Sequence, residues 1–157
     1  MSIEKVRDYF KSLGAEDKII TFDVSSATVE LASQALGVDG ALIAKTLSFM
    51  VDGAPVLIVT AGDMKVDNSK FKATFHTKAK MLTYDEAHEL IGHDVGGVCP
   101  FAVNEGCRVY LDVSLKRFEV VYPAAGNASS AIRLTIPELE SFSNYIDYVD
   151  VCKSREA

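Results

Sequence analysis

A lysine on the apolar face of an expected strand is the first feature of this chain that could do chemistry. Residues 43, 47, 49 and 51 are apolar and share a strand face with Lys45, because side chains alternate between the two faces. An ammonium group there is costly unless it is paired or opens into a cleft. Lys45 is therefore either a cation at a cleft or a residue at a frayed strand start that extends to solvent.

Two adjacent glycines, Gly96 and Gly97, are a second candidate for chemistry. Without side chains they leave main-chain N–H groups open to a ligand. Pro100 follows shortly after and stiffens the loop, because its ring fixes φ. A rigid loop with accessible amides suits a carbonyl oxygen, an oxyanion or a phosphate. Together with Lys45, the loop is a candidate binding site for such an oxygen.

These elements resemble the YbaK/ProX family of aminoacyl-tRNA deacylases, which includes the editing domain inserted in some bacterial prolyl-tRNA synthetases. The resemblance runs from about Thr21 to Leu139 and rests on three short motifs. They are Ala44-Lys45-Thr46-Leu47 at a strand start, the G-x-x-x-P signature from Gly96 to Pro100, and a late strand and glycine turn at 120–127 followed by Ile132-Arg133-Leu134.

The resemblance implies an enzyme that hydrolyses the ester between an amino acid and the terminal ribose of a mischarged tRNA. Lys45 would bind the terminal phosphate or polarise the ester, and the main chain of Gly96 and Gly97 would hold the carbonyl or its developing oxyanion. A water assisted by a ribose hydroxyl would attack, and no cofactor is implied. The other substrate-binding residues would be Phe22, Thr28, Thr46, Val98, Cys99, Pro100 and Gly126.

The amino acid removed is expected to be small and uncharged, of the alanine, cysteine, serine or threonine class. Near the late glycine turn, alanines stand where the branch that clears cysteine from proline tRNA has polar and acidic residues, so the choice stays open. A weak hold on free tRNA implies a partner, such as prolyl-tRNA synthetase. The sequence does not indicate an oligomeric state.

Two functions of other classes remain open from the residues. The fold could be a non-catalytic module that binds tRNA ends or a regulatory protein. Alternatively, Cys99 could be the nucleophile of a small-molecule esterase or thioesterase. His88 and His93 are five residues apart, which is not the spacing of a helical zinc pair, so the sequence indicates no metal site. His93 is assigned to a loop, Gly92-His93-Asp94.

The net charge of the chain opposes a large nucleic-acid-binding face but leaves room for a small basic patch. A net charge of −6 opposes a protein that grips nucleic acid over a large basic face. One segment is nevertheless basic, and it is either an ordinary solvated helix and turn or a small patch that meets only a tRNA 3′ end. Its members are Lys65, Lys70, Lys72, His76, Lys78 and Lys80.

Length and composition indicate one globular domain over residues 1–157. The hydrophobic content is 48%, enough for a substantial core. No apolar run approaches the roughly 18 residues of a membrane helix, and the first residues do not form a signal peptide. Three cysteines without a C-x-x-C pair favour a reducing cytoplasm.

Periodicity and turn signals predict an α+β fold, with a mixed sheet surrounded by helices. The family resemblance implies that this sheet is partly barrel-like. Gly14 and Gly37 are expected to end the first two helices, and Ser26 to cap the second. Expected helices cover 4–13, 28–36, 68–74 and 84–91, and a last one begins at 137. Expected strands cover 19–22, 43–51, 56–60, 80–82, 109–112, 119–122, 131–134 and 146–151.

Overall fold

A long hairpin forms the centre of the molecule. The structure is a computed structural model and describes residues 2–93 and 96–156. Strands β2 (Ile43–Val51) and β3 (Ala54–Ala61) pair in antiparallel register, with Lys45 opposite Thr60. The turn consists of Asp52 and Gly53 alone, both at positive φ, as short hairpin turns require. The predicted hairpin is confirmed, although β3 begins two residues earlier than expected because the turn is this tight.

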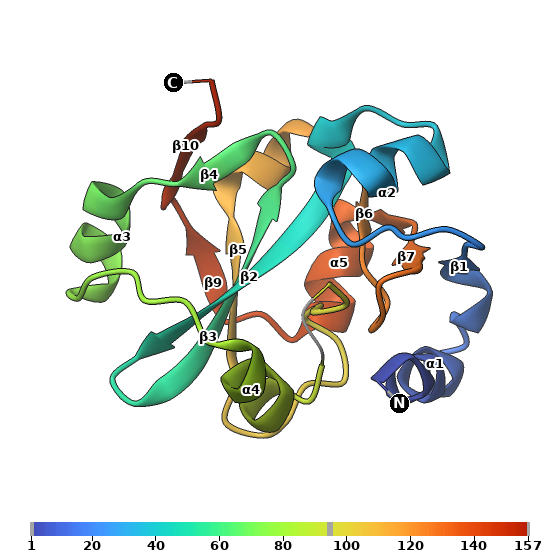
Figure 1. Cartoon of the computed structure of the whole chain (residues 1–157), viewed down its shortest axis with the longest axis horizontal. Coiled ribbons are helices and arrows are strands. Elements are labelled where there is room, and N and C mark those ends of the chain that lie inside the picture. The colour runs from blue at the N-terminus through green and yellow to red at the C-terminus, as the bar shows by residue number, and fades with distance from the viewer. Residues whose placement is uncertain (1, 94–95, 157) are drawn as a thin grey trace.

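Four further strands complete a six-stranded mixed sheet. Its order is β8-β6-β2-β3-β5-β9, with β6 (Val120–Pro123), β8 (Leu134–Thr135), β5 (Arg108–Asp112) and β9 (Asp147–Val149). Strands β6 and β2, β3 and β5, and β5 and β9 run parallel, whereas β8 is antiparallel to β6. The sheet curls into a partial barrel (Figure 1), so the predicted fold class is confirmed.

Helices surround this sheet at its ends and on its faces. In Figure 1, α3 lies at the end of the molecule opposite α1 and β1, and α5 packs near β6. No helix in the described residues is long and apolar enough to cross a membrane. The α-helices are α1 (Ser2–Ser12), α2 (Val29–Leu36), α3 (Asn68–Phe75), α4 (Tyr84–Glu86), which continues as the π-helical η3 (Ala87–Ile91), and α5 (Ile136–Ser143). Short 3₁₀ turns occur at η1 (Glu16–Lys18), η2 (Gly40–Leu42) and η4 (Val113–Arg117).

Two pairs of short strands lie outside the main sheet, and three of the predicted strands need correction. Strand β1 (Ile19–Thr21) pairs with β7 (Ser130–Ile132), and β4 (Met64–Val66) pairs with β10 (Cys152–Ser154). The expected strand 131–134 is therefore divided between β7 and β8, and the expected strand 146–151 contains only β9, with β10 beginning just after it. The expected strand 80–82 makes a single bridge between Met81 and Phe49. In each case the pairing partner, which local sequence does not specify, decides where the strand ends.

The cap of α2 is also corrected. The Thr28 side chain accepts a hydrogen bond from Leu31 N at 3.1 Å and is the N-cap, whereas Ser26 is buried and donates its hydroxyl to the Ser130 carbonyl. Gly37 ends the helix in the left-handed conformation, as predicted. The cap matters for the site because Thr28 stands at the rim of the cavity described below.

The hydrophobic core explains why β3 is central. From Pro55 to Ala61 every residue of β3 is buried, since helices or loops cover both faces of the strand. On one face, Val6 and Phe10 of α1 pack with Leu139 of α5, and Phe10 meets Phe101 edge-on at 5.0 Å between ring centroids. On the other, Phe71 of α3 packs in a second cluster. These contacts hold the hairpin rigidly beside the candidate site.

Candidate active site

A gap in strand pairing leaves part of β2 uncovered. Strand β6 pairs with β2 only at Ile43 and Ala44, and the bridge from Met81 reaches β2 only at Phe49. Along the edge between them, from residue 45 to residue 47, no described segment pairs with β2 as a neighbouring strand. An interior strand with an open edge is exceptional, because unpaired main-chain groups are costly away from water.

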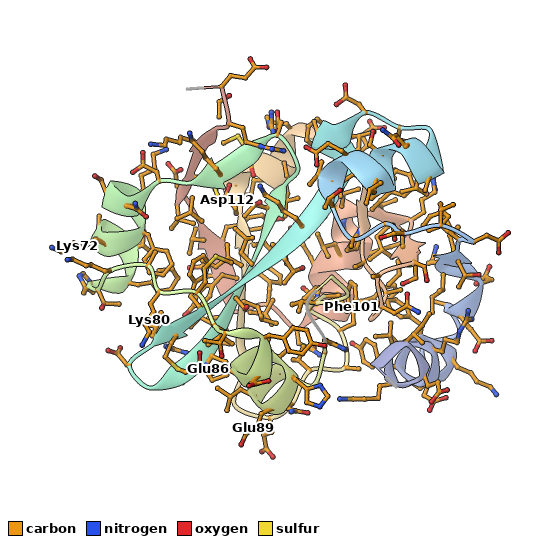
Figure 2. All side chains as sticks on the ribbon, viewed as in Figure 1. Lys72, Lys80, Glu86, Glu89, Phe101 and Asp112 are labelled. Carbon is orange, nitrogen blue, oxygen red and sulfur yellow. The ribbon has the colours of Figure 1, made fainter. Side chains whose placement is uncertain are left out.

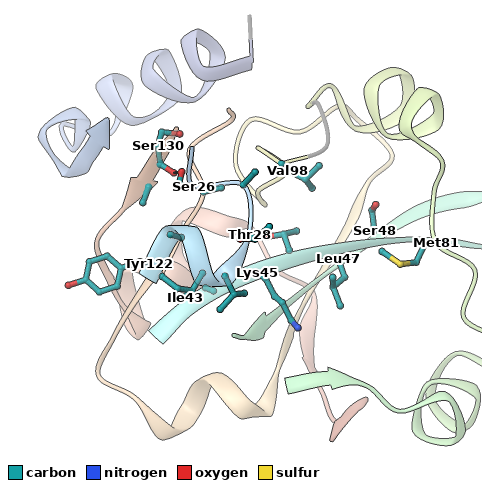
Figure 3. A pocket seen from close by; sticks show the side chains of 18 of the residues that line it. Ser26, Thr28, Ile43, Lys45, Leu47, Ser48, Met81, Val98, Tyr122 and Ser130 are labelled. Carbon is teal, nitrogen blue, oxygen red and sulfur yellow. Dashed lines mark hydrogen bonds between the residues drawn. The ribbon is translucent and has the colours of Figure 1, made fainter. Parts of the chain in front are cut away.

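A cavity of about 370 Å³ lies over this gap (Figure 3). Residues 43–48 of β2 form one wall, and Met81 with Leu82 closes one end. Tyr122 and Ala124, in and just after β6, stand at the other end, and residues at the start of α2 also line the cavity. Gly96 and Val98 bring the glycine loop to the same space. The cavity therefore collects segments that are far apart in the sequence.

Lys45 is half-buried and paired. Its Nζ donates a hydrogen bond to the main-chain carbonyl of Met64 in β4. In Figure 3 the Lys45 and Leu47 side chains extend from the same side of β2, and Ser48 extends from the opposite side toward Val98. Burial lowers the pKa of Lys45 below its ordinary value, and the positive charge of Arg155 lowers that pKa further. The ammonium group thus lies on one side of the cavity, next to β4, rather than free in solvent.

The two glycines of the loop have different positions. Gly96 has φ +97°, which side-chain-bearing residues rarely adopt, and it lines the cavity. Gly97 is buried, and a Cβ atom on it would collide with the main chain of Gly126 and Asn127. Gly97 therefore lets the loop pack directly on the turn after β6, and this packing keeps Gly96 at the cavity.

The structure brings half of the expected site residues together on the cavity. Gly97, Pro100 and Gly126 are buried beside it without lining it. Phe22 hydrogen-bonds the Ser129 carbonyl through its main-chain N–H and is not in the lining either. The residues that do line the cavity are Thr28, Lys45, Thr46, Gly96 and Val98.

Cys99 lies in the core rather than in the cavity. Its side chain is 0% exposed, packs with Val6 and Phe101, and donates its thiol to the Phe101 carbonyl at 3.8 Å. Burial raises the pKa of the Cys99 thiol to about 12, so the thiolate is scarce at neutral pH. The Cys99 Sγ is 3.6 Å from His93 Nε2. His93 is buried here, whereas Asp94, which the sequence assigns to the same loop, lies outside the described residues.

The structure adds lining residues that the sequence does not single out. Ser48 could have been found, because it shares a strand face with Thr46. Five more come from segments that only the folded chain brings to β2, so no local signal identifies them as site residues. They are Ser26, Met81, Leu82, Tyr122 and Ser130. Among the residues that the structure describes, no group of three side chains is arranged to hold a metal ion.

One polar group in this region is buried without a partner. The Thr46 hydroxyl oxygen is shielded from solvent, and no hydrogen bond reaches it from any described residue. Threonine hydroxyls in protein interiors are normally hydrogen-bonded, because leaving one unpaired costs about 1–3 kcal/mol. Thr46 is one of the lining residues, so this unpaired hydroxyl belongs to the wall of the cavity.

The basic segment lies on the surface near α3. Figure 2 shows Lys72 and Lys80 on this side of the molecule, and Lys80 directly precedes Met81 at the cavity. Lys70 is paired with Asp150 at 3.0 Å and also donates to the Cys152 carbonyl. Lys72, Lys78 and Lys80 are exposed. The segment is thus a partly neutralised surface with three accessible cations beside the cavity.

Comparison with known proteins identifies the family. The sequence profile of the aminoacyl-tRNA editing domain matches residues 23–142. The chain belongs to this family. It is 50% identical to the uncharacterized protein YwhH of Bacillus subtilis over 99% of this chain and 100% of YwhH. It is 30% identical to a proline–tRNA ligase of Leuconostoc citreum over 71% of this chain, which spans only 20% of that ligase.

A solved structure supports the same assignment. It is described as "Crystal structure of a putative trans-editing enzyme for prolyl tRNA synthetase" and matches with a TM-score of 0.87, 26% identity and 98% coverage of both chains. The resemblance inferred from the three motifs is therefore confirmed. The chain is a hydrolase of the aminoacyl-tRNA deacylase class.

Proposed function

We propose that this deacylase removes a small, uncharged amino acid from mischarged tRNA, and that the cavity beside β2 is its active site. The observation that carries the proposal is that Lys45 and Gly96, which come from distant parts of the sequence, line one cavity. Its volume, about 370 Å³, is near the lower end for ligand pockets and suits a short acyl group. We assign the amino acid removed to the alanine, cysteine, serine or threonine class, as the family resemblance implies.

The reaction is hydrolysis of an ester. A water oxygen attacks the carbonyl carbon, the bond from that carbon to the ribose oxygen breaks, and the ribose oxygen takes up a proton. The products are the free amino acid and uncharged tRNA. An amide of the Gly96 loop would stabilise the oxyanion that forms on the carbonyl, and Gly97 would keep that loop in place through its packing on Gly126 and Asn127. The neighbouring ribose hydroxyl would assist the water.

Lys45 would contribute its positive charge at the side of the cavity. Its ammonium group is held by the Met64 carbonyl and is partly buried, so its field is weakened less than that of an exposed lysine. We assign it to the terminal phosphate or to the ester oxygen. Thr28, Thr46 and Val98 would shape the acyl pocket.

The RNA would approach across the exposed lysines next to Met81. Three accessible cations in a chain of net charge −6 give a short, salt-sensitive contact, which suits recognition of a tRNA end and not of a whole tRNA. Because the protein alone would bind free tRNA weakly, we propose that a synthetase such as prolyl-tRNA synthetase acts as its partner. The similarity to part of a proline–tRNA ligase supports this choice. Aminoacyl-tRNA is made in the cytoplasm, where we place the reaction.

An esterase or thioesterase that uses Cys99 has no support in the geometry. The thiol is fully buried, its pKa is raised to about 12, and it does not line the cavity. A nucleophile needs access to substrate and a populated thiolate. Cys99 has neither.

The test is deacylation of four mischarged tRNAs by the wild-type protein and the Lys45→Ala variant. The panel consists of alanyl and cysteinyl esters of proline tRNA, with seryl- and threonyl-tRNA alongside. We expect one or two members to be cleared far above their spontaneous rates and the variant to lose this activity. Equal clearance by both proteins would remove Lys45 from the mechanism, and failure to clear any member would overturn the proposed substrate class.

A further inference from the structure

The open edge of β2 presents main-chain groups to the cavity. In an antiparallel pair, alternate residues direct both their N–H and C=O groups to the same neighbour. Met50 N donates to the Lys80 carbonyl at 2.8 Å, and Leu82 N donates to the Ser48 carbonyl at 3.1 Å. Even-numbered residues of β2 therefore direct their main-chain groups away from β3. By this alternation the N–H and C=O of Thr46, and the N–H of Ser48, face the gap.

The part of the chain that the structure describes supplies no partner for these groups. Strand β6 stops pairing at Ala44, and the segment at Met81 begins beyond them. The Thr46 hydroxyl, at the same position, is buried and unpartnered as well. One residue of the cavity wall thus carries two oxygen acceptors that no described residue pairs, and the rest of the wall consists mainly of apolar side chains. Groups left unpaired together in one cavity point to a ligand that pairs them.

The chemistry of these oxygens selects one part of the substrate. The carbonyl oxygen accepts and cannot donate, and the hydroxyl can accept, so a cationic N–H donor suits both. An aminoacyl ester carries one such donor, the α-ammonium group. The only charged side chain among the described lining residues, Lys45, has its Nζ engaged by Met64 on the side next to β4. No carboxylate is present in that same described lining, so main-chain and hydroxyl oxygens are the acceptors that remain there.

We propose that Thr46 binds the α-ammonium group of the acyl chain through its carbonyl and hydroxyl oxygens, and that this contact restricts the enzyme to esters of unmodified α-amino acids. The inference rests on the proposed function and goes further, because it names the recognised group and a specificity residue. Esters whose amino group has been replaced or blocked would be rejected even when the side chain fits.

The test compares an aminoacyl-tRNA with its α-hydroxy counterpart. Nitrous acid converts the amino group of an aminoacyl ester to a hydroxyl of nearly the same size, so bulk is not a variable. The probe is the panel member that the wild-type protein clears fastest, and each enzymatic rate is divided by the spontaneous rate of the same ester. We expect the amino ester to be preferred at least about tenfold, the usual scale for a hydrogen bond to a charged group.

Three variants assign the preference to Thr46. Thr46→Val removes the hydroxyl at almost constant volume and should reduce the preference for the amino ester several-fold, whereas Thr46→Ser should retain it. Because the hydroxyl removed was buried and unpaired, Thr46→Val should also raise Tm by about 2–4 °C. Thr60→Val is the matched control, since Thr60 is buried opposite Lys45 on β3 and its hydroxyl donates to the Ala61 carbonyl. It should leave both the preference and the rate unchanged.

The outcomes separate the two proposals. If the wild-type protein clears neither form of any panel member, the proposed function fails and this inference fails with it. If it clears both forms at equal relative rates, deacylation stands and α-ammonium recognition is overturned. If the amino ester is preferred but Thr46→Val preserves the full preference, recognition does not involve the Thr46 hydroxyl and the assignment is overturned. Loss of preference in Thr46→Val with a raised Tm supports it.

Discussion

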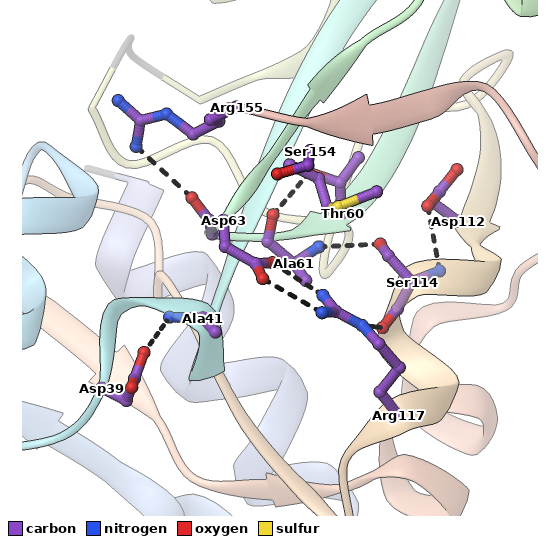
Figure 4. Close-up of polar contacts among 12 residues, drawn as sticks. Asp39, Ala41, Thr60, Ala61, Asp63, Asp112, Ser114, Arg117, Ser154 and Arg155 are labelled. Atoms are coloured by element: carbon purple, nitrogen blue, oxygen red, sulfur yellow. Dashed lines mark hydrogen bonds and ion pairs between the residues drawn. The ribbon is translucent and has the colours of Figure 1, made fainter. Parts of the chain in front are cut away.

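Two polar regions flank the central hairpin, and they differ in whether their polar groups have partners within the protein. The first is the Asp112 cluster, formed by Asp112, Ser114, Arg117 and Asp63 (Figure 4). The Asp112 carboxylate accepts from Ser114 N and Val151 N, both at 3.0 Å, and the Ser114 hydroxyl accepts from Ala61 N. Arg117 makes a two-fold contact with Asp63 and also donates to the Ser114 carbonyl.

The second region is the cavity beside β2, where pairing is incomplete. There the Thr46 hydroxyl has no partner among the described residues, and the strand edge is open. Buried polar groups that satisfy one another stabilise a fold, and groups that stay unsatisfied stabilise it only when something else binds. We infer from this contrast that the Asp112 cluster stabilises the fold and that the cavity binds a ligand. The predictions below test that division.

The largest expected effect is on catalysis at the cavity. Lys45→Ala removes the charge proposed to stabilise the reacting ester or its phosphate, so kcat/KM should fall about 100-fold or more. Lys11→Ala is the control, because Lys11 is an exposed lysine of α1, outside both the cavity and the basic segment, and should keep full activity. Initial rates of deacylation measure both. An equal loss of kcat/KM in the two variants would mean that the activity depends on the overall positive charge of the protein and not on the lysine at the cavity.

The Asp112 cluster should respond in stability instead. Asp112→Ala leaves two buried amides, Ser114 N and Val151 N, without their acceptor, and each costs about 1–3 kcal/mol. Urea unfolding should show this loss, while the folded fraction keeps wild-type kcat/KM. Asp150→Ala, at an exposed carboxylate paired with Lys70, should change stability by less than about 1 kcal/mol. A catalytic defect in folded Asp112→Ala would break the division between the two regions.

Cys99 belongs with the structural region although it follows the glycine loop. Cys99→Ala should lower stability by about 1–2 kcal/mol through lost packing and keep deacylation within about twofold of wild type. Because burial holds the Cys99 pKa at about 12, iodoacetamide should leave this thiol unmodified in the folded protein at pH 7.5. Loss of turnover in a folded Cys99→Ala protein would restore the thioesterase hypothesis.

The exposed lysines near the cavity should act through RNA affinity. Neutralising Lys72 and Lys80 together should raise KM about threefold to tenfold at low salt and leave kcat unchanged. The effect should shrink toward physiological salt, because exposed charges are screened. Lys11→Ala, at an exposed lysine of α1, is the control. Kinetics of the double variant that match wild type at low salt would remove the basic segment from the tRNA interface.

The smallest expected effect is the pH dependence of stability at Lys45. Burial lowers its folded-state pKa below the ordinary value near 10.5, so between these two values the unfolded chain holds more protons than the folded chain. The contribution of Lys45 to the free energy of unfolding should therefore rise with pH between its lowered folded-state pKa and the ordinary value. The difference in unfolding free energy between wild type and Lys45→Met isolates it from other groups that titrate there. A difference that falls with pH would contradict the burial of the ammonium group.

The sequence predicted the elements whose signals are local. The turn at Asp52 and Gly53, the end of α2 at Gly37 and the alternation along β2 all follow from residue types and spacing. The expected strand at 80–82 and the unbroken strand at 131–134 were wrong, because their extents depend on partners from other parts of the chain. Pairing between distant segments leaves little trace in either segment alone.

The candidate site divides in the same way. Lys45 on an apolar strand face and the adjacent glycines could be recognised from the sequence alone. A charged residue at an expected buried position and two consecutive residues without side chains are both unusual. The open edge of β2 was not visible, since it exists only where β6 ends and the Met81 bridge begins. The place of Cys99 in the core was also hidden, because α1 packs over it from far away in the chain.

The central claim, that the open edge of β2 binds the acyl group, is tested most directly by amide hydrogen exchange with a stable substrate analogue. The analogue is 3′-aminoacylamino-3′-deoxyadenosine bearing the amino acid that the panel identifies, in which an amide replaces the ester. At saturation we predict slower exchange at the amides of Thr46 and Ser48, because the bound analogue covers the open edge and shields these amides from water. Exchange should not change at Ala61 and Ser114, whose amides are already paired. Unchanged exchange at Thr46 and Ser48, with protection elsewhere, would contradict the account.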